Sequence, residues 1–306
     1  MQRRIFVRIV ISILLASGLA SAQRPQSAAS KPPQRIVSTT PSVTELLYAL
    51  GLGDRVAGVT RFCRYPPEAQ LKPKVGDYIN PNLEVIASLR PDLVIIQTNP
   101  VRLADRLGAL RLKTLEVNQD GIEAICSSIR SIASAAGVAG RGETLIASIQ
   151  AKLAEIRQRA ASLQKARVLF VVGRNPDRLD GMIVVGNASY LSELIELAGG
   201  ENVFGDAVAA YPQVSLEEVI ARNPEVIIDF GDMGDPSRIT DQHKRAIVSL
   251  WQRASSIKAV KRHRVEAVAA DIFVVPGPRA VNAAESIFSI LHPEASRPTG
   301  QGRGTR

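Results

Sequence analysis

Aromatic side chains in loops are the residues of this sequence best suited to bind a ligand. The chain has only 4% aromatic residues, yet Phe62, Tyr78 and Tyr211 all lie in stretches that contain Pro and polar residues. Tyr78 stands four residues ahead of Asn82, and Tyr211 stands four residues ahead of Ser215. Both polar residues are suited to cap a helix. Aromatic faces on two such loops would fit a flat, bulky, partly apolar ligand, unless each Tyr packs against its own loop.

Two acidic residues occupy matching positions, each two residues after one of these predicted caps. They are Glu84 and Glu217. An acid in the first turn complements the helix dipole, and Ser215 with Glu218 has the pattern of a capping box. A matched pair of acids would also give symmetric docking points for Arg side chains of a two-fold partner. Both interpretations stay open.

Direct metal capture and catalysis are not favoured by the sequence. The three histidines, His243, His263 and His292, lie in separate segments, whereas a transition-metal site needs several ligands that converge. The sequence contains no G-x-S-x-G, H-E-x-x-H or P-loop lysine motif. We therefore expect surface histidines, no metal site, no resident cofactor and no enzymatic activity; an exported enzyme on a duplicated scaffold is the alternative from another class.

A repeat shows how these residues are positioned. Residues 82–97 (NLEVIASLRPDLVIIQ) and 215–230 (SLEEVIARNPEVIIDF) follow the same pattern, 133 positions apart. A shorter echo precedes each copy, TELL at 44–47 and SELI at 192–195. Two similar units in one chain predict two similar lobes, and a ligand usually binds between lobes.

Strands alternate with helices in both halves, which predicts an α/β fold of two Rossmann-like lobes with mostly parallel sheets. In the first half the expected strands are 35–38, 56–59, 93–96 and 113–117, and the expected helices are 41–50, 82–89, 102–107 and 121–135. In the second half the expected strands are 168–172, 184–185, 226–229 and 265–268, and the expected helices are 188–198, 215–221, 241–251 and 279–291.

One long helix is predicted between the lobes. Residues 141–163 keep an apolar stripe at helical spacing, which includes Leu145, Ile149, Leu153 and Ile156. Some 23 residues of helix would span roughly 34 Å. We divide the chain into lobes at 35–138 and 165–292 with the connector at 139–164, and we expect this stiff connector to limit closure.

The N-terminus has the pattern of a secretion signal at 1–22. Arg3, Arg4 and Arg8 precede an apolar run, and Ala20-Ser21-Ala22 forms an A-x-A cleavage site. We expect a soluble periplasmic protein after cleavage near Ala22, with a retained anchor as the alternative. Residues 23–34 and 293–306 have the composition of a disordered leader and a flexible tail.

Composition and cysteine usage add little that is specific. A hydrophobic content of 45% with 22% charged residues fits a packed α/β protein, and the net charge of +9 is spread along the chain. The basic run at 258–264 (KAVKRHR) is predicted to be a solvated helix end or loop, so nucleic acid is not an expected partner.

Cys63 and Cys126 would enter an oxidising compartment, but the sequence does not show that they can pair. A buried free thiol is expected at Cys126.

The sequence resembles the periplasmic vitamin B12-binding receptors and, more broadly, the helical-backbone receptors for cobalamin, ferric siderophores and haem. The resemblance covers about residues 35–293. It rests on RIVSTTPSVTELLYALG, YPPEAQ, NLEVIASLRPDLVI, YPQVSLEEVIARNPEVII and VPGPRAVNAAESIFSILHPE, which occur in the order of the family segments.

The resemblance implies a monomeric receptor that holds cobalamin between two lobes and delivers it to the permease dimer of an ABC transporter in the inner membrane. It assigns ligand contacts to Phe62, Tyr78 and Tyr211, to Gln97, where those receptors carry an aromatic residue, and to the last-loop residues Asp271 and Arg279. It also maps two permease-docking acids onto Glu84 and Glu217. The alternative within the class is a ferric-siderophore or haem receptor, for which Arg61, Arg64, Arg174 and Arg279 would supply positive charge.

Overall fold

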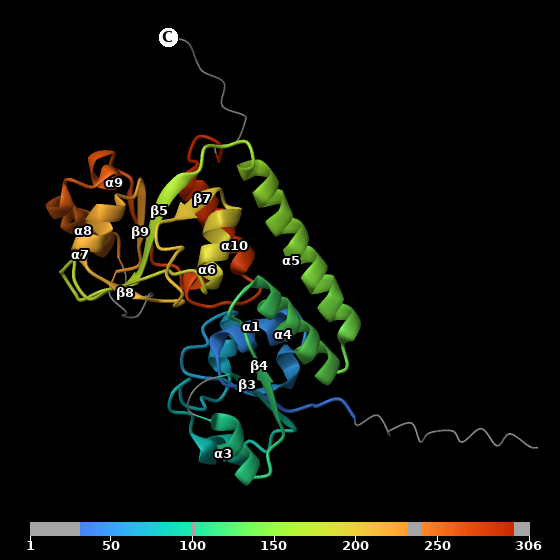
Figure 1. The fold of residues 1–306 in the computed structure, drawn as a ribbon. Coiled ribbons are helices and arrows are strands. Elements are labelled where there is room, and N and C mark those ends of the chain that lie inside the picture. The colour runs from blue at the N-terminus through green and yellow to red at the C-terminus, as the bar shows by residue number, and fades with distance from the viewer. Residues whose placement is uncertain (1–30, 99–101, 232–239, 297–306) are drawn as a thin grey trace, which may run out of the picture. The chain divides into compact units, whose positions relative to one another are not determined.

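The N-terminal lobe is built on a four-stranded parallel sheet. The computed structural model describes residues 31–98, 102–231 and 240–296 (Figure 1). The strand order of this sheet is β2-β1-β3-β4. The strands are β1 (Ile36–Ser38), β2 (Val56–Gly58), β3 (Leu93–Gln97) and β4 (Thr114–Val117). Because all pairs are parallel, the carboxyl ends of the strands lie at one edge of the sheet.

Helices connect these strands, and α2 begins directly after its predicted capping residue. They are α1 (Pro41–Ala49), α2 (Leu83–Ser88), α3 (Leu103–Ala109) and α4 (Ile122–Ala135). Asn82 caps α2 by accepting a hydrogen bond from the Val85 amide at 3.0 Å. Helix α1 ends before Gly51, whose φ of +70° lies in the left-handed region that glycine tolerates at the end of a helix.

The C-terminal lobe has a larger and mostly parallel sheet. Its order is β10-β9-β5-β6-β8, with β7 paired to β5. The strands are β5 (Ala166–Gly173), β6 (Met182–Val184), β7 (Gly200–Asn202), β8 (Gln213–Val214), β9 (Val226–Asp229) and β10 (Val265–Ala267). Strand β6 is antiparallel to both of its neighbours. The prediction of two α/β lobes with mostly parallel sheets is confirmed.

The helices of this lobe are α6 (Tyr190–Leu197), α7 (Leu216–Arg222), α8 (Asp241–Trp251), α9 (Lys258–Lys261) and α10 (Ala280–Leu291). Helix α7 begins with the predicted capping box, in which Ser215 and Glu218 exchange hydrogen bonds of 2.8 and 3.2 Å. The basic run at 258–264 forms α9 and the turn before β10, as expected, and Lys258 and Arg262 pair with Glu225.

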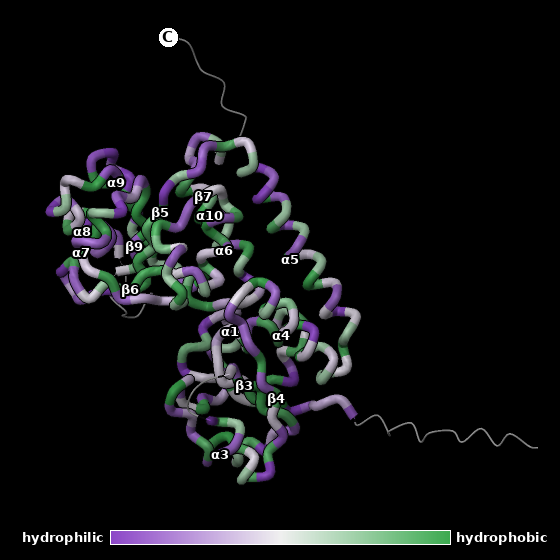
Figure 2. The backbone as a smooth tube through the Cα atoms, in the orientation of Figure 1, coloured by the Kyte–Doolittle hydropathy of each residue, from purple (hydrophilic) through white to green (hydrophobic). Residues whose placement is uncertain are grey.

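Helix α5 (Ala139–Ala160) connects the two lobes. It begins two residues before the predicted start and ends three residues before the predicted end. Gly142 lies in its first turns, where a Cβ atom would fall 2.6 Å from the Cβ of Ala133 on α4. Glycine is therefore required by the close approach of two helices, despite its low helix propensity. In Figure 2 the α5 tube alternates between hydrophilic and hydrophobic colours, in keeping with one buried stripe that includes Ile146, Ile149 and Leu153.

The largest hydrophobic cluster extends through both lobes. It includes Leu46 of α1, Ile129 of α4, Ile149 of α5, Leu194 of α6 and Ile287 of α10, all nearly inaccessible to solvent. A hinge motion that separated the lobes would expose part of this surface, at about 25 cal/mol for each Å². The shared core therefore opposes separation of the lobes.

Several predictions concern segments that the structure does not describe. The predicted signal at 1–22 and most of the leader lie outside the described residues, and so does most of the predicted tail. In the described ranges, no helix combines the length and the apolar character needed to cross a bilayer.

Candidate ligand-binding site

A cavity of about 590 Å³ lies where the two lobes meet. Its N-terminal wall is formed by residues that follow the carboxyl ends of all four strands of the first sheet, which is the edge where open α/β sheets bind ligands. Its other wall comes from the start of α6 and from two loops of the C-terminal lobe. The lining residues are Thr40, Pro41, Ser42, Phe62, Arg64, Tyr78, Gln97, Gln119, Asp120, Ala188, Ser189, Tyr190, Ala210, Tyr211, Asp271, Val274, Val275 and Pro276.

Five of the six predicted ligand residues line this cavity: Phe62, Tyr78, Gln97, Tyr211 and Asp271. Phe62 is 50% exposed and Tyr211 46% exposed, so neither side chain is fully buried by packing against its own loop. Their contact with a ligand stays a prediction, but the structure brings these side chains together from both lobes.

The hydroxyl groups of the cavity tyrosines are engaged by the protein. Tyr78 donates to the carbonyl of Thr98 at 3.3 Å, and Tyr190 donates to the carbonyl of Ile272 at 3.4 Å. The Tyr211 oxygen accepts a hydrogen bond from Ser189 at 3.1 Å. Burial raises the pKa of Tyr211 and raises that of Tyr190 well above 10. Tyr190 and Tyr211 therefore stay neutral at physiological pH.

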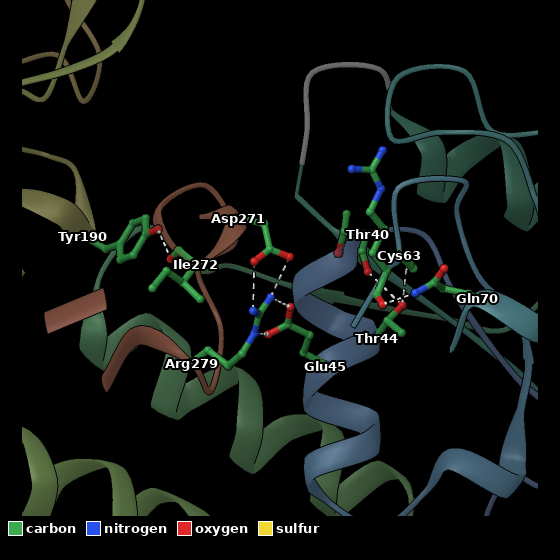
Figure 3. A network of polar contacts seen from close by, with 10 residues as sticks. Thr40, Thr44, Glu45, Cys63, Gln70, Tyr190, Asp271, Ile272 and Arg279 are labelled. Atoms are coloured by element: carbon green, nitrogen blue, oxygen red, sulfur yellow. Dashed lines mark hydrogen bonds and ion pairs between the residues drawn. The ribbon is translucent and has the colours of Figure 1, made fainter. Parts of the chain in front are cut away.

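Arg279 is placed differently from the other predicted ligand residues. It does not line the cavity, and its guanidinium binds Glu45 of α1 and Asp271 of the last loop (Figure 3). The Arg279 Nε–Glu45 Oε2 distance is 2.9 Å, and the guanidinium also lies 4.2 Å from the ring centre of Tyr65. Because Glu45 and Arg279 belong to different lobes, this ion pair joins them beside the cavity.

A second polar contact joins the lobes at α6. The carboxylate of Glu193 accepts a hydrogen bond from the backbone amide of Ile122, at the start of α4, at 3.2 Å. Glu45 and Glu193 hold the same position in the two short repeats TELL and SELI. Each lobe therefore contributes one acid, at the same position of the short repeat, that contacts the other lobe.

Carboxylates neutralise most of the arginines that sequence reasoning offered for an anionic ligand. Arg61 pairs with Asp77 at 2.6 Å. Arg174 is buried against Asp229 at 3.0 Å, and the same carboxylate accepts from the indole of Trp251 at 2.7 Å. This buried network anchors the loop after β5, so Arg174 is a structural residue. Of the four arginines, only Arg64 lines the cavity.

Glu84 and Glu217 both lie in the first turns of short helices, α2 and α7, and both are exposed. Neither carboxylate belongs to the cavity lining. This arrangement is compatible with both earlier interpretations, a helix-dipole role and a docking role.

Groups that would bind a metal ion are not gathered at the site. Within the described ranges, no three His, Cys, Asp or Glu side chains form a cluster able to hold a metal. His243 takes part in the capping of α8, and His292 lies against the carbonyl of Ala198. Cys63 and Cys126 are free and buried.

Gln119 is a cavity residue that sequence reasoning missed. It follows β4 by two residues, so the rule that ligand sites gather at the carboxyl ends of parallel strands could have indicated it. It is 1% exposed, and its Oε1 accepts a hydrogen bond from Ser42 at 2.5 Å.

Comparison with known proteins agrees with this architecture. Residues 36–271 match the model of the periplasmic binding protein family, and the chain belongs to that family. The vitamin B12-binding protein of Vibrio cholerae is 29% identical over 85% of this chain and 90% of that protein. A crystal structure of the V. cholerae protein BtuF superposes with a TM-score of 0.72 at 28% identity, covering 87% of this chain and 99% of that chain.

Two further relatives extend the comparison. An uncharacterized ABC transporter substrate-binding lipoprotein of Bacillus subtilis, YvrC, is 31% identical over 86% of this chain and 82% of that protein. The periplasmic heme-binding protein RhuT of Roseiflexus sp. RS-1 in its apo form gives a TM-score of 0.72 at 28% identity, covering 86% and 99% of the two chains. The prediction of a substrate-binding protein that serves an ABC importer is confirmed.

Proposed function

We propose that this protein captures cobalamin in the cavity between its lobes and delivers it to the permease of an ABC importer. The observation that supports this most directly is the cavity itself, where Phe62, Tyr78 and Tyr211 offer aromatic surface from both lobes. Relatives of similar length at 29% identity are named vitamin B12-binding proteins, which favours the same ligand class.

The polar groups of the cavity favour cobalamin over haem. A protein that coordinates haem iron supplies an axial ligand such as His, Cys, Met or tyrosinate. Among the described residues that line the cavity there is no His, Cys or Met. The hydroxyl groups of the lining tyrosines Tyr78, Tyr190 and Tyr211 form hydrogen bonds within the protein, and the raised pKa values of Tyr190 and Tyr211 oppose their ionisation. The cobalt of cobalamin brings its own axial ligands and needs none from the protein.

The charge of the cavity disfavours an anionic ferric siderophore. Such a ligand would be bound by Arg or Lys side chains without carboxylate partners. Of the four candidate arginines, Arg61, Arg174 and Arg279 are each paired with an acid. Arg64 alone of the four lines the cavity, together with the acids Asp120 and Asp271, whereas cobalamin carries neutral amides around its ring. We keep haem and ferric siderophores as alternatives because a relative of equal structural similarity is named a heme-binding protein.

The remaining parts of the proposal are export, docking and the monomeric state. The pattern at residues 1–22 supports secretion with cleavage near Ala22, and the exposed Glu84 and Glu217 support docking to two permease subunits.

Isothermal titration of the protein with cyanocobalamin, haem and a small siderophore panel tests the identity of the ligand. We expect cyanocobalamin to bind most tightly, and tighter binding of another ligand would refute the assignment.

A further inference from the structure

A buried amide in the cavity wall has an unused hydrogen-bond donor. Gln119 lines the cavity, yet its Nε2 atom has no hydrogen-bond partner among the described residues. Leaving a buried donor unsatisfied is unfavourable, whereas supplying an acceptor atom removes that penalty. A ligand that brings an acceptor oxygen to this amide would therefore gain affinity at this point of the cavity.

The short contact with Ser42 orients the amide, because 2.5 Å is typical of an O–H···O hydrogen bond and is shorter than an N–H···O one. Ser42 uses its one proton to donate to Gln119 Oε1 at 2.5 Å. Thr40 must therefore be the donor in the 3.2 Å contact between Thr40 Oγ1 and Ser42 Oγ. Thr40 Oγ1 in turn accepts from the amide of Val43 as the cap of α1. The chain of donors runs from α1 through the two hydroxyls to Gln119, and its remaining donor is Nε2.

The electrostatic field of α1 favours the same kind of ligand atom. Pro41 and Ser42, the first residues of this nine-residue helix, line the cavity, and no acid lies in its first turn. By contrast, α4 and α6 carry Glu123 and Glu193 near their starts. The first turn of α1 therefore keeps a partial positive charge that attracts electron-rich oxygen, while the nearest acids of the cavity wall, Asp120 and Asp271, lie on other segments.

We propose that Gln119, oriented by Ser42 and Thr40, is a specificity-determining donor to an acceptor oxygen of the ligand. This inference rests on the proposed function, and it adds a polar contact to the aromatic ones. Two sources could supply the oxygen: an amide carbonyl at the rim of a corrin, or a carboxylate such as a haem propionate.

Three variants test the donor role against cyanocobalamin and haem. Gln119→Leu removes the amide, and Gln119→Glu keeps the acceptor for Ser42 while it replaces the donor with an oxygen. Ser42→Ala leaves Gln119 in place without its orienting partner. The control is Gln150→Glu, which makes the same change in charge on the exposed face of α5.

We expect Kd for the ligand that meets Gln119 to rise on the order of tenfold in both Gln119 variants, since one hydrogen bond is lost. Ser42→Ala should raise it several-fold, and Gln150→Glu should leave it unchanged. A rise for cyanocobalamin identifies the amide carbonyl as the source of the oxygen, and a rise for haem identifies the propionate. Melting temperatures without ligand identify variants that fail to fold; if Gln119→Leu fails, the other two carry the test.

The outcomes separate this inference from the proposed function. If the parent protein binds tightly and the Gln119→Glu and Ser42→Ala variants have the same Kd as the parent, the donor role of Gln119 is wrong and the proposed function stands. A parent protein that binds neither ligand would overturn both.

Discussion

Replacing Arg279 with Leu should destabilise the protein much more at pH 7 than at pH 5. The substitution leaves the carboxylate of Glu45, whose side chain is only 2% exposed, without its cation. Burial is the main reason why the pKa of Glu45 is already raised above 4.5, and Arg279 is the main group that lowers it. Without Arg279 the pKa must rise further.

The expected size follows from the cost of neutralising this carboxyl group. Breaking a buried pair by removing one partner costs about 3–5 kcal/mol. Protonation limits the loss, because holding a group of ordinary pKa 4.5 neutral costs about 3 kcal/mol at pH 7 and about 1 kcal/mol at pH 5. Since the native variant binds a proton that the unfolded chain has released, the free energy of unfolding falls as pH rises from about 5 to 7.

Urea denaturation at pH 5, 6 and 7 measures this directly. Glu45→Gln combined with Arg279→Leu should recover most of the lost stability at pH 7, since no buried charge remains. Arg159→Leu is the matched control: Arg159 forms a bidentate pair with Glu285, but both side chains are over a third exposed. The Arg159→Leu substitution should lower the free energy of unfolding by about 1 kcal/mol, nearly independently of pH. An equal loss at pH 5 and pH 7 for Arg279→Leu would refute the reasoning.

The remaining predictions concern the cavity, closure and docking. Tyr78→Ala and Tyr211→Ala should each weaken cyanocobalamin binding by about 1–3 kcal/mol in isothermal titration, whereas the Phe variants keep the ring and should lose less; unchanged binding in the double Ala variant would rule out the site. Small-angle scattering with and without saturating ligand should give nearly the same radius of gyration, and a contraction of several ångströms would contradict the limit set by α5. Changing Glu84 and Glu217 together to Lys should abolish transport in reconstituted vesicles without altering ligand affinity, and normal transport would reduce these acids to helix-dipole residues.

The fold was predictable from local patterns, because helix caps, hydrophobic periodicity and each copy of the internal repeat are short stretches of neighbouring residues. Asn82 and Ser215 act as the caps that the sequence indicates. The start of α5 was misjudged because Gly140 and Gly142 have low helix propensity, and only the close packing on Ala133 explains Gly142. Strands β7 and β8, of three and two residues, were not among the expected strands.

The site was harder to predict because its polar contacts join distant parts of the chain. Arg279 pairs with Glu45, which lies 234 positions away, and no local pattern reveals that pairing. Its contact with a ligand stays a prediction. Gln119 is oriented by Ser42 from 77 positions away. Aromatic residues in loops could be recognised from their sequence neighbours, whereas ion pairs and buried donors depend on which loops meet in the folded chain.

Most cavity residues lie in connecting segments or at the ends of strands and helices, such as Gln97 at the end of β3, while the buried cluster that holds the lobes together lies mainly on helices and strands. Residues such as Phe62, Gln97 and Tyr211 can therefore change without disturbing the apolar packing beneath them. Selection can then diversify the cargo of this scaffold through a few loop substitutions at small cost in stability. This separation of cavity from core agrees with the two solved structures. One is named a vitamin B12-binding protein and the other a heme-binding protein, and both superpose equally well on this chain.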